Sequence, residues 1–274
     1  MKIMANSIPK GGTHLLLRLI GLLGFESHKF WIGADLIRGR FALLNKLARG
    51  HYAEDTVLIG SEVPIKIGAR WLAGRLDAVP DNAVFGAHCQ YTSGLQQLLE
   101  QANVKTICIV RDPRAIAASH LHYIKSSPGH FFHGDYMRLE SDHSRLMTSI
   151  QGGQLGSYQL ESIGSRYRNY VDWSRKGGAL IVRFEDLVGE QGGGTGDGQL
   201  RAVASVAEFL GKGLPESKIK AVCDQLFGGS FTFRKGQVDS WRDELEQDHK
   251  QALSKDLGSL LQDLGYEKNQ DWAQ

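Results

Sequence analysis

The segment Ser-Ile-Pro-Lys-Gly-Gly-Thr-His, residues 7–14, decides the fold, because it joins a predicted strand to a predicted helix through two adjacent glycines. We expect the strand over Lys2–Ser7 and the helix over Thr13–Leu23, with Gly24 as the left-handed residue that ends many helices. A glycine turn at a helix start directs several backbone N–H groups at one point, where the helix dipole adds positive potential. The segment therefore predicts a phosphate-binding loop, and an ordinary tight turn is the competing interpretation.

The side chains of this loop fit an anionic ligand. Lys10 supplies a mobile positive charge and Thr13 a hydroxyl, while Gly11 and Gly12 let the backbone approach the ligand. Lys10 precedes both glycines, whereas the loop of nucleoside-triphosphate enzymes has its lysine after the second glycine. The sequence also offers no convincing strand-terminal aspartate for magnesium, so we expect no metal cofactor.

The rest of the chain alternates short β-rich runs with longer segments of helical periodicity, which is typical of α/β proteins. Further strands are expected over Ala83–Cys89, Lys105–Arg111 and Ala179–Phe184, with a weaker one over Thr56–Gly60. Further helices are expected from Asp112-Pro113 to about Tyr123, over Tyr158–Lys176, and around residues 200–210, 216–226 and 243–264. Residues 106–110 are apolar and rich in β-branched side chains, so their strand should be central and covered on both faces. The pattern predicts a three-layer α/β fold with a mostly parallel central sheet and a phosphate-binding strand-loop-helix.

The composition is that of a globular protein, with 274 residues of which 42% are hydrophobic and 23% charged. Lys plus Arg number 32 against 30 Asp plus Glu, and a net charge of +2 argues against a nucleic-acid partner. Cys89, Cys108 and Cys223 are far apart in apolar surroundings, which favours reduced core thiols and a cytoplasmic location. The longest apolar run, Leu15–Phe25, contains Arg18 and is shorter than the ~20 residues of a membrane span, so no span is expected.

We expect a single elaborated domain over residues 1–274, although the length alone leaves room for two. Residues 191–198 hold five glycines in eight positions, which predicts a flexible surface loop within that domain. Residues 123–150 mix Ser-Ser-Pro-Gly with aromatic side chains, a composition that fits an acceptor-site flap as well as an ordinary loop. The sequence carries no signal for an oligomeric state.

Two further segments carry cations suited to a phosphate. Arg111 would emerge at the carboxyl end of a buried strand, where open parallel sheets bind ligands, and Ser119 follows about two turns into the next helix. Near the C-terminus, Arg234, Lys235 and Gly236 make a compact anion clamp ahead of a tryptophan. Taken singly, the first segment also fits an ion pair, and the second a solvated turn with the tryptophan as a core anchor.

His88 is the candidate general base. It stands at the end of the predicted strand Ala83–Cys89, on the ligand side of the sheet, and an imidazole pKa near 6.5 suits proton abstraction at neutral pH. A lone histidine is more often structural, so its position rather than its residue type singles it out. Five other histidines form a loose group without zinc-ligand spacing, and we expect no metal there: His120, His122, His130, His133 and His143.

Together these segments resemble the sulfotransferases that use 3′-phosphoadenosine 5′-phosphosulfate (PAPS). Four motifs match that family in order: Pro9-Lys10-Gly11-Gly12-Thr13-His14, Arg111 with Ser119, Phe184-Glu185-Asp186-Leu187, and Arg234-Lys235-Gly236 through Trp241. The resemblance implies that the first motif holds the 5′-phosphosulfate, that the second and fourth hold the 3′-phosphate, and that Phe184 lies near the adenine. Three positions depart from the family: His14 replaces a hydroxyl, Leu15 an adenine-stacking tryptophan, and Gly86 the lysine of animal cytosolic members.

The resemblance also implies the reaction, which is transfer of a sulfuryl group from PAPS to a hydroxyl or an amine. Lys10 would stabilise charge on the departing phosphate, and His88 would remove the acceptor proton. Aromatic side chains in the flap favour a small-molecule phenol or lipid-like alcohol over a charged glycan. Two alternatives stay open. One is a magnesium-dependent P-loop-type nucleotide kinase, and the other is a non-catalytic PAPS-binding module that would tolerate loss of His88.

Overall fold

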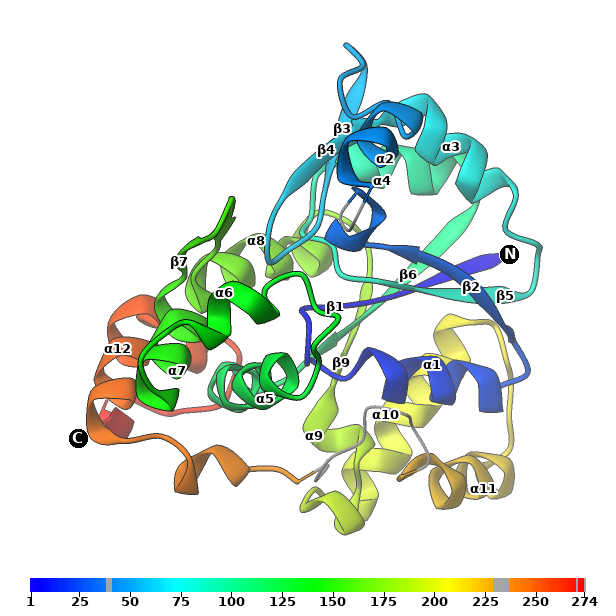
Figure 1. Ribbon diagram of the computed structural model, residues 1–274. Helices are drawn as coiled ribbons and strands as arrows, with labels where there is room; N and C mark the ends of the chain where they lie inside the picture. Colours follow the sequence, from blue (N-terminus) through cyan, green and yellow to red (C-terminus); the bar gives the residue numbers. More distant parts are fainter. Residues whose placement is uncertain (38–40, 229–236, 270, 274) are drawn as a thin grey trace.

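A computed structural model describes residues 1–37, 41–228, 237–269 and 271–273. Its centre is a five-stranded parallel sheet in the order β2-β5-β1-β6-β9 (Figure 1). The strands are β1 (Lys2–Ser7), β2 (Glu26–Ile32), β5 (Ala83–Ala87), β6 (Val104–Val110) and β9 (Leu180–Arg183). Because the strands are parallel, their carboxyl ends meet at one edge of the sheet, and the segments that follow them come together there.

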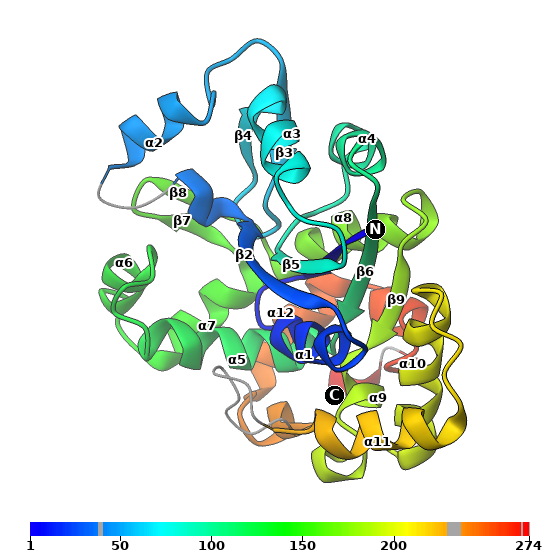
Figure 2. The same cartoon turned by 90° about the vertical axis from the view of Figure 1, so that its right-hand side faces the viewer.

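Successive side chains of the strands enter two separate hydrophobic cores. In β1, Ile3 and Ala5 belong to one core and Met4 to the other, as the two-residue period of a strand requires. The first core is covered by α1 (Thr13–Leu22), α10 (Gly196–Phe209) and α11 (Glu216–Leu226). The second is covered by α4 (Ser93–Gln101), α5 (Pro113–Lys125) and α8 (Ile163–Arg175), as Figure 2 shows. The predicted three-layer α/β fold is confirmed.

The remaining elements lie in the connections and at the C-terminal end. Between β2 and β5 are the 3₁₀ helix η1 (Ala34–Ile37), α2 (Ala42–Ala48), the antiparallel pair β3 (Thr56–Ile59) and β4 (Ile65–Gly68), and α3 (Ala69–Asp77). Between α5 and α8 are α6 (His133–Met137), α7 (Asp142–Gln151), and the hairpin of β7 (Gly153–Leu155) and β8 (Tyr158–Leu160). The later elements are α9 (Phe184–Leu187), η2 (Glu190–Gly192), η3 (Ser240–Asp243), α12 (Gln247–Leu257), α13 (Leu260–Asp263) and η4 (Asp271–Ala273). No described helix is both long and apolar enough to span a membrane.

All five predicted strands are present, and three details of the sheets differ from expectation. Residues 56–59 form a strand, but it pairs only with β4 and lies outside the central sheet. The edge strand β2 was not predicted, because Glu26, Ser27 and His28 give it a polar first half. β6 is an interior strand with neighbours on both sides, as expected, whereas the middle position of the sheet belongs to β1.

The helix predictions hold except at three boundaries. Residues 158–160, which were assigned to the long helix, form β8 instead, because Ser162 caps α8 by accepting a hydrogen bond from the Ser165 backbone N–H. The helix expected over residues 243–264 is divided at Gly258, which has a φ of 56°. The glycine-rich segment 191–198 ends inside α10, whose first residue is Gly196. The flexibility of its remaining residues stays a prediction.

The predicted flap, residues 123–150, is largely helical, since it contains the end of α5, all of α6 and most of α7. Its movement stays a prediction. The thiol prediction is confirmed, because Cys89, Cys108 and Cys223 are all buried and free.

Arg114 ties the start of α5 to the C-terminal segment. Its side chain is 2% exposed, and its guanidinium bonds Asp112 at 2.7 Å and also pairs with Glu267. The same guanidinium lies between two indole rings, 4.0 Å from the centre of Trp241 and 4.7 Å from that of Trp272. Trp241 is 1% exposed, so the tryptophan of the fourth motif is a core anchor.

We expect Arg114→Ala to lower the free energy of unfolding by about 3–5 kcal/mol, because it leaves the buried carboxylate of Asp112 without its cation. Urea denaturation measures this change. The matched control is Arg138→Ala, which removes an ion pair to Asp135 from an arginine that is 79% exposed and should change stability by less than ~0.5 kcal/mol. Similar losses in the two variants would contradict this account of Arg114.

Candidate active site

The loop between β1 and α1 is held tightly by its own side chains and backbone. Gly11 N donates to the Ile8 carbonyl at 2.8 Å, and the hydroxyls of Ser7 and Thr13 are hydrogen-bonded to each other. A Cβ atom at Gly11 would lie 2.8 Å from the Ile8 carbonyl oxygen, so only glycine fits there. Because the loop closes on itself in this way, it brings the chain directly from the strand end to the helix start.

Gly12 marks the point where the loop becomes helix. Its φ of 110° is a conformation that L side chains rarely adopt, and a Cβ there would lie 2.8 Å from the Phe184 ring. As the N-cap residue of α1, Gly12 has no side chain with which to cap the helix. The first N–H groups of α1 are therefore left to other acceptors, and the helix dipole favours an anion at that point.

Arg111 lies beside this loop, immediately after the end of β6. Its Nη1 donates to the Lys10 carbonyl at 3.2 Å, and its guanidinium lies 4.3 Å from the centre of the Phe184 ring. Burial lowers the pKa of Arg111, and the nearby carboxylate of Glu185 opposes that shift. Its buried Nε has no hydrogen-bond partner among the described residues. A half-buried cation whose Nε still has a hydrogen bond to donate attracts a further anion.

His88 follows β5 and is attached to the same loop. Its Nδ1 lies 3.0 Å from the Ser7 carbonyl oxygen, which can only accept, so Nδ1 carries the proton and Nε2 has the lone pair. Burial lowers the pKa of His88 to about 4, against the opposing effects of the Ser7 carbonyl and the Glu62 carboxylate. At neutral pH the imidazole is therefore uncharged and able to accept a proton at Nε2.

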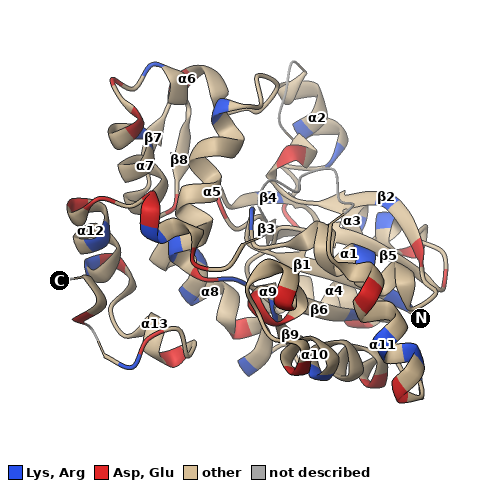
Figure 3. Ribbon diagram, turned by 90° about the horizontal axis from the view of Figure 1, so that it is seen from below, with Lys and Arg blue, Asp and Glu red and all other residues tan. Residues whose placement is uncertain are grey.

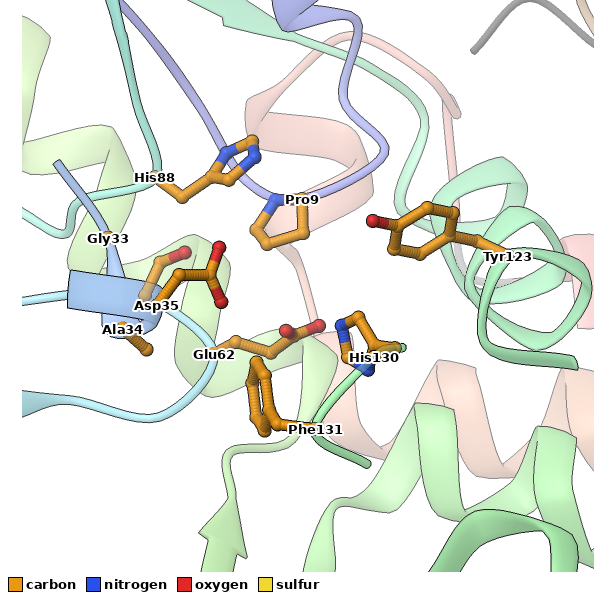
Figure 4. A pocket seen from close by; sticks show the side chains of 10 residues that line it. Pro9, Gly33, Ala34, Asp35, Glu62, His88, Tyr123, His130 and Phe131 are labelled. Carbon is orange, nitrogen blue, oxygen red and sulfur yellow. The ribbon is translucent and has the colours of Figure 1, made fainter. Parts of the chain in front are cut away.

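A cavity opens beside His88 and is lined by groups from five parts of the chain (Figure 4). The lining residues are Pro9, Gly33, Ala34, Asp35, Ser61, Glu62, His88, Tyr123, His130 and Phe131. Lys10 lies at its edge, with Nζ 4.1 Å from the centre of the Tyr123 ring. The predicted flap thus contributes Tyr123, His130 and Phe131 to the same cavity as the candidate base.

The Glu62 carboxylate and the His130 ring point toward each other in the lining of this cavity, as Figure 4 shows. Glu62 is 6% exposed, and its Oε1 lies 2.7 Å from His120 Nε2 and 3.3 Å from Arg166 Nη1. Although burial opposes ionisation, His120 and then Arg166 hold the pKa of Glu62 well below its usual range. Burial lowers the pKa of His130 to about 4, and its Nδ1 accepts from Phe132 N at 3.2 Å, so Nε2 carries its proton.

The structure brings most of the predicted site residues together. Lys10, Gly11, Gly12 and Thr13 form the loop, and His88, Arg111 and Phe184 contact that loop. His14 is exposed on α1, with its ring 5.8 Å from that of Trp31. Ser119 is half-buried in the second turn of α5. Arg234, Lys235 and Gly236 lie outside the described residues.

Several residues of the site were missed in the sequence, and Trp31 and Glu62 are the most informative of them. Trp31 covers Gly86, where a Cβ atom would lie 2.1 Å from its ring, and its ring centre is 5.1 Å from that of His88. The space beside Gly86 is therefore filled by an indole from the edge strand, which leaves no room for a lysine. Glu62 could have been noticed as a single acid between the apolar runs 57–59 and 63–65.

The five histidines of the loose group separate in the structure. His120 pairs with Glu62, His122 with Glu244, and His133 Nδ1 lies 2.7 Å from the Ile124 carbonyl oxygen, while His130 lines the cavity. His143 instead lies near the surface beside Glu246, Asp248 and the buried His249, and the potential ligand atoms of these four residues are within 4.8 Å of one another. Both ring nitrogens of His249 already contact backbone groups, Glu246 N at 3.2 Å and the His143 carbonyl at 3.4 Å.

The fold and site define the class of protein: an α/β protein with a glycine-rich strand-loop-helix and a neutral histidine over an adjoining cavity. Residues 1–228 match the family described as "Sulfotransferase domain", and the chain belongs to this family. A search of curated proteins found no significant match.

Solved structures agree on the fold. Mouse sulfotransferase SULT7A1, complexed with PAP, has a TM-score of 0.63 and 16% identity, covering 96% of this chain and 86% of its own. Retinol dehydratase with androsterone and the inactive cofactor PAP has a TM-score of 0.62 and 16% identity, covering 96% of this chain and 81% of its own. Retinol dehydratase with retinol and PAP has a TM-score of 0.63 and 16% identity, covering 98% of this chain and 83% of its own. The family match identifies a sulfotransferase, and these structures share its fold.

NMR titration should give a pKa of about 4 for His88, with the urea-unfolded chain as the control near the ordinary value of ~6.5. His88→Asn assigns the resonance and separates it from that of His130. Because the pKa of His88 is lower in the folded chain than in the unfolded chain, the unfolded chain binds this proton more readily between pH values of about 4 and ~6.5. His88 should therefore reduce stability as the pH falls through that range. A folded-state pKa at or above 6.5 would contradict the burial assigned to this ring.

Proposed function

We propose that the protein transfers a sulfuryl group from PAPS to a hydroxyl of a small-molecule acceptor, releasing PAP. The observation that carries this proposal is His88, a neutral imidazole fixed by the Ser7 carbonyl between the anion-binding loop and the cavity. The acceptor hydroxyl would lose its proton to Nε2 as its oxygen attacks sulfur and the bond from sulfur to the phosphate oxygen breaks. The donor loop and the acceptor cavity thus meet at one residue.

The donor site is supported by groups that match the two anionic ends of PAPS. The loop of Lys10, Gly11, Gly12 and Thr13 would bind the 5′-phosphosulfate through backbone N–H groups, the Thr13 hydroxyl and the Lys10 ammonium. Arg111, whose buried Nε has no hydrogen-bond partner in the part of the chain that the structure describes, fits the 3′-phosphate. Ser119, Arg234, Lys235 and Gly236 are proposed to share that role. Phe184 would lie beside the nucleotide with its ring already against Arg111. The family relationship and the PAP bound in each of the three structural relatives favour this donor over ATP.

Lys10 has a second proposed role, in the chemical step. Its φ of 70° is unusual for a non-glycine residue, and its ammonium lies over the Tyr123 ring at the edge of the cavity. From there it could meet the negative charge that develops on the leaving phosphate. Donors placed where charge develops stabilise a transition state more than they stabilise the bound substrate.

The cavity favours an uncharged or cationic acceptor. Tyr123 and Phe131 offer aromatic surface for an aryl or alkyl group, which suits a phenol or lipid-like alcohol. Glu62, which is ionised, and Asp35 place carboxyl groups in the lining, and the Glu62 charge would repel an anionic acceptor. Retinol and androsterone, which are bound in the two retinol dehydratase complexes, are alcohols of this general kind.

The Arg111 assignment predicts that PAP binds more tightly than AMP, which lacks the 3′-phosphate. A charged hydrogen bond contributes about 1.5–3 kcal/mol, so loss of the contact should reduce affinity by roughly 10–150-fold. Isothermal calorimetry with both nucleotides should show that Arg111→Ala removes most of the preference, while Arg138→Ala, on the surface, keeps it. Equal affinities of the wild type for PAP and AMP would argue against a 3′-phosphate site.

The His88 assignment predicts that His88→Asn lowers kcat by ~10²–10⁴-fold, the range for a positioned general base. PAP affinity and thermal stability should stay near wild type, because the nucleotide contacts lie elsewhere. Since the free enzyme's His88 has a pKa of about 4, its protonation should reduce kcat/KM only in acid, leaving a flat profile through neutral pH.

Three measurements on the same His88→Asn protein separate the possible roles. Near-normal turnover in a folded variant would rule out the base, and a parallel loss of stability and PAP binding would indicate a structural histidine.

The wild type separates the alternative functions. A wild type that binds PAP without transferring sulfate to a broad panel of acceptors would be a binding module. Magnesium-dependent transfer from ATP would indicate a kinase.

A further inference from the structure

One part of the acceptor cavity carries polar groups to which the proposed transfer step gives no role. Glu62 and His130 supply them, and Figure 4 shows their side chains pointing toward each other, apart from His88. Within the described part of the chain, neither a hydrogen bond nor an ion pair joins these two side chains. The space between them can therefore hold a ligand group that contacts both.

Glu62 has one carboxylate oxygen in use and one available. Oε1 lies 2.7 Å from His120 Nε2 and 3.3 Å from Arg166 Nη1, whereas Oε2 has no hydrogen-bond partner among the described residues. Arg166 is itself fixed, because its Nε donates to the Glu161 carbonyl at 2.8 Å and its Nη2 to the Ser149 carbonyl at 3.1 Å. This fully buried guanidinium largely balances the charge of Glu62. In the cavity, Oε2 is therefore chiefly a strong hydrogen-bond acceptor.

His130 supplies a donor that is held in place. Its Nδ1 accepts from Phe132 N at 3.2 Å, and its backbone N donates to the Ser127 carbonyl at 2.9 Å. Its ring stacks on that of Phe131, with 4.5 Å between the ring centres, and lies edge-on to that of Tyr123 at 5.4 Å. Since burial lowers the pKa of His130 to about 4, the ring is uncharged at neutral pH. It thus offers the cavity its Nε2–H donor and no acceptor.

A buried hydroxyl in the same lining is also unsatisfied. Ser61, which precedes Glu62 in the chain, is 2% exposed, and its Oγ has no hydrogen-bond partner in the residues that the structure describes. Buried polar atoms are normally hydrogen-bonded. Together with the available Oε2 of Glu62, this hydroxyl indicates a polar occupant in this part of the cavity.

The acceptor on Glu62 and the donor on His130 determine which kind of group fits between them. An ammonium group would donate to Glu62 but would place its own N–H groups against the N–H of His130. A carbonyl or ether oxygen would accept from His130 but has no proton to donate to Glu62, and an anion would be repelled by that carboxylate. A hydroxyl donates and accepts at one atom, so it satisfies both residues.

Long-range electrostatics does not override this local choice. The net charge of the chain is +2, and Figure 3 shows basic and acidic residues interspersed over the described elements. A field that steers ligands by charge needs a cleft or surface lined by one sign of charge. The hydrogen-bonding groups of the cavity therefore determine which acceptor is preferred.

We propose that Glu62 and His130 form a subsite for a second hydroxyl of the acceptor, so that the substrate is a diol or a phenol with a further hydroxyl. This inference rests on the proposed function, because the first hydroxyl is the one that loses its proton to His88. The second hydroxyl donates to Glu62 Oε2 and accepts from His130 Nε2–H. Tyr123 and Phe131, in the same lining, contact the carbon skeleton. Binding at both ends directs one hydroxyl to His88 and holds the other away from it, which makes transfer selective for one hydroxyl.

Matched acceptors test this subsite. The compound 4-(2-hydroxyethyl)phenol is compared with 4-ethylphenol, which lacks the second hydroxyl, and with 4-(2-methoxyethyl)phenol, whose ether oxygen cannot donate. With PAPS as donor, we expect kcat/KM for the hydroxylated compound to exceed both others by about ten-fold or more, because its hydroxyl bonds a charged group. The isomeric dihydroxybenzenes, each with its mono-methyl ether and with phenol, extend the test to shorter spacings between the hydroxyls.

Two variants assign the preference to these residues. His130→Phe keeps an aromatic ring but removes the donor, so it should reduce the preference over 4-ethylphenol by roughly 3–10-fold and leave turnover of 4-ethylphenol near wild type. Glu62→Gln removes the charged acceptor and should reduce the preference to less than about three-fold. Because that variant leaves the buried Arg166 without its carboxylate, thermal unfolding checks its fold, and His130→Phe carries the test if it is unfolded. The matched control is His122→Phe, outside the cavity lining, which should keep the full preference.

The outcomes separate this subsite from its alternatives. A wild type without preference for any hydroxylated compound, or a His130→Phe protein with the whole preference, would overturn the proposal. A stronger preference for 4-(2-aminoethyl)phenol would overturn it in favour of a cationic acceptor.

Calorimetry of the same compounds with PAP present measures recognition without turnover. Tighter binding of the hydroxylated compounds without transfer from PAPS would contradict the proposed function and support the subsite. Transfer to the panel without a preference would contradict the subsite alone.

Discussion

The site depends on the close contact between the glycine loop and the ends of the neighbouring strands. Gly12 packs against Phe184, which follows β9, and the Lys10 carbonyl accepts a hydrogen bond from Arg111, which follows β6. On the other side of the loop, the Ser7 carbonyl accepts a hydrogen bond from Nδ1 of His88, which follows β5. Any side chain at Gly12 would push the loop away from Phe184. The conformational freedom of one glycine therefore determines whether residues from four strands share one site.

Parallel pairing explains why much of this site could be predicted from the sequence. Residues that follow adjacent parallel strands must lie at the same edge, so recognising the strands before Lys10, His88 and Arg111 was enough to bring these residues together. The order of the strands did not have to be known in full. For the same reason, the wrong boundary at residue 158 and the unpredicted β2 left this part of the prediction unchanged.

The other side of the cavity could not be predicted in this way, because long connections form it. Glu62 lies after a hairpin strand outside the main sheet, and His130 lies in the connection that follows α5. The position of Glu62 depends on buried ion pairs with His120 and Arg166, which join segments up to 104 residues apart. No short-range pattern encodes such pairs. The lowered pKa values of His88 and His130 likewise depend on burial, and their tautomers depend on hydrogen-bond partners, neither of which a sequence states.

The two ends of the site carry charges of opposite sign. In a transfer reaction this arrangement would affect both the entry of the acceptor and the release of the product. Lys10 and Arg111 lie where the donor anion would bind, whereas Glu62 holds an ionised carboxylate at the far side of the cavity. An alcohol enters such a cavity without electrostatic penalty, but a sulfate ester would leave it carrying a new negative charge beside Glu62. His120 and Arg166 bind the carboxylate through Oε1 and reduce this repulsion without removing it. In the proposed reaction, the same buried carboxylate would therefore disfavour anionic acceptors and favour release of the sulfated product.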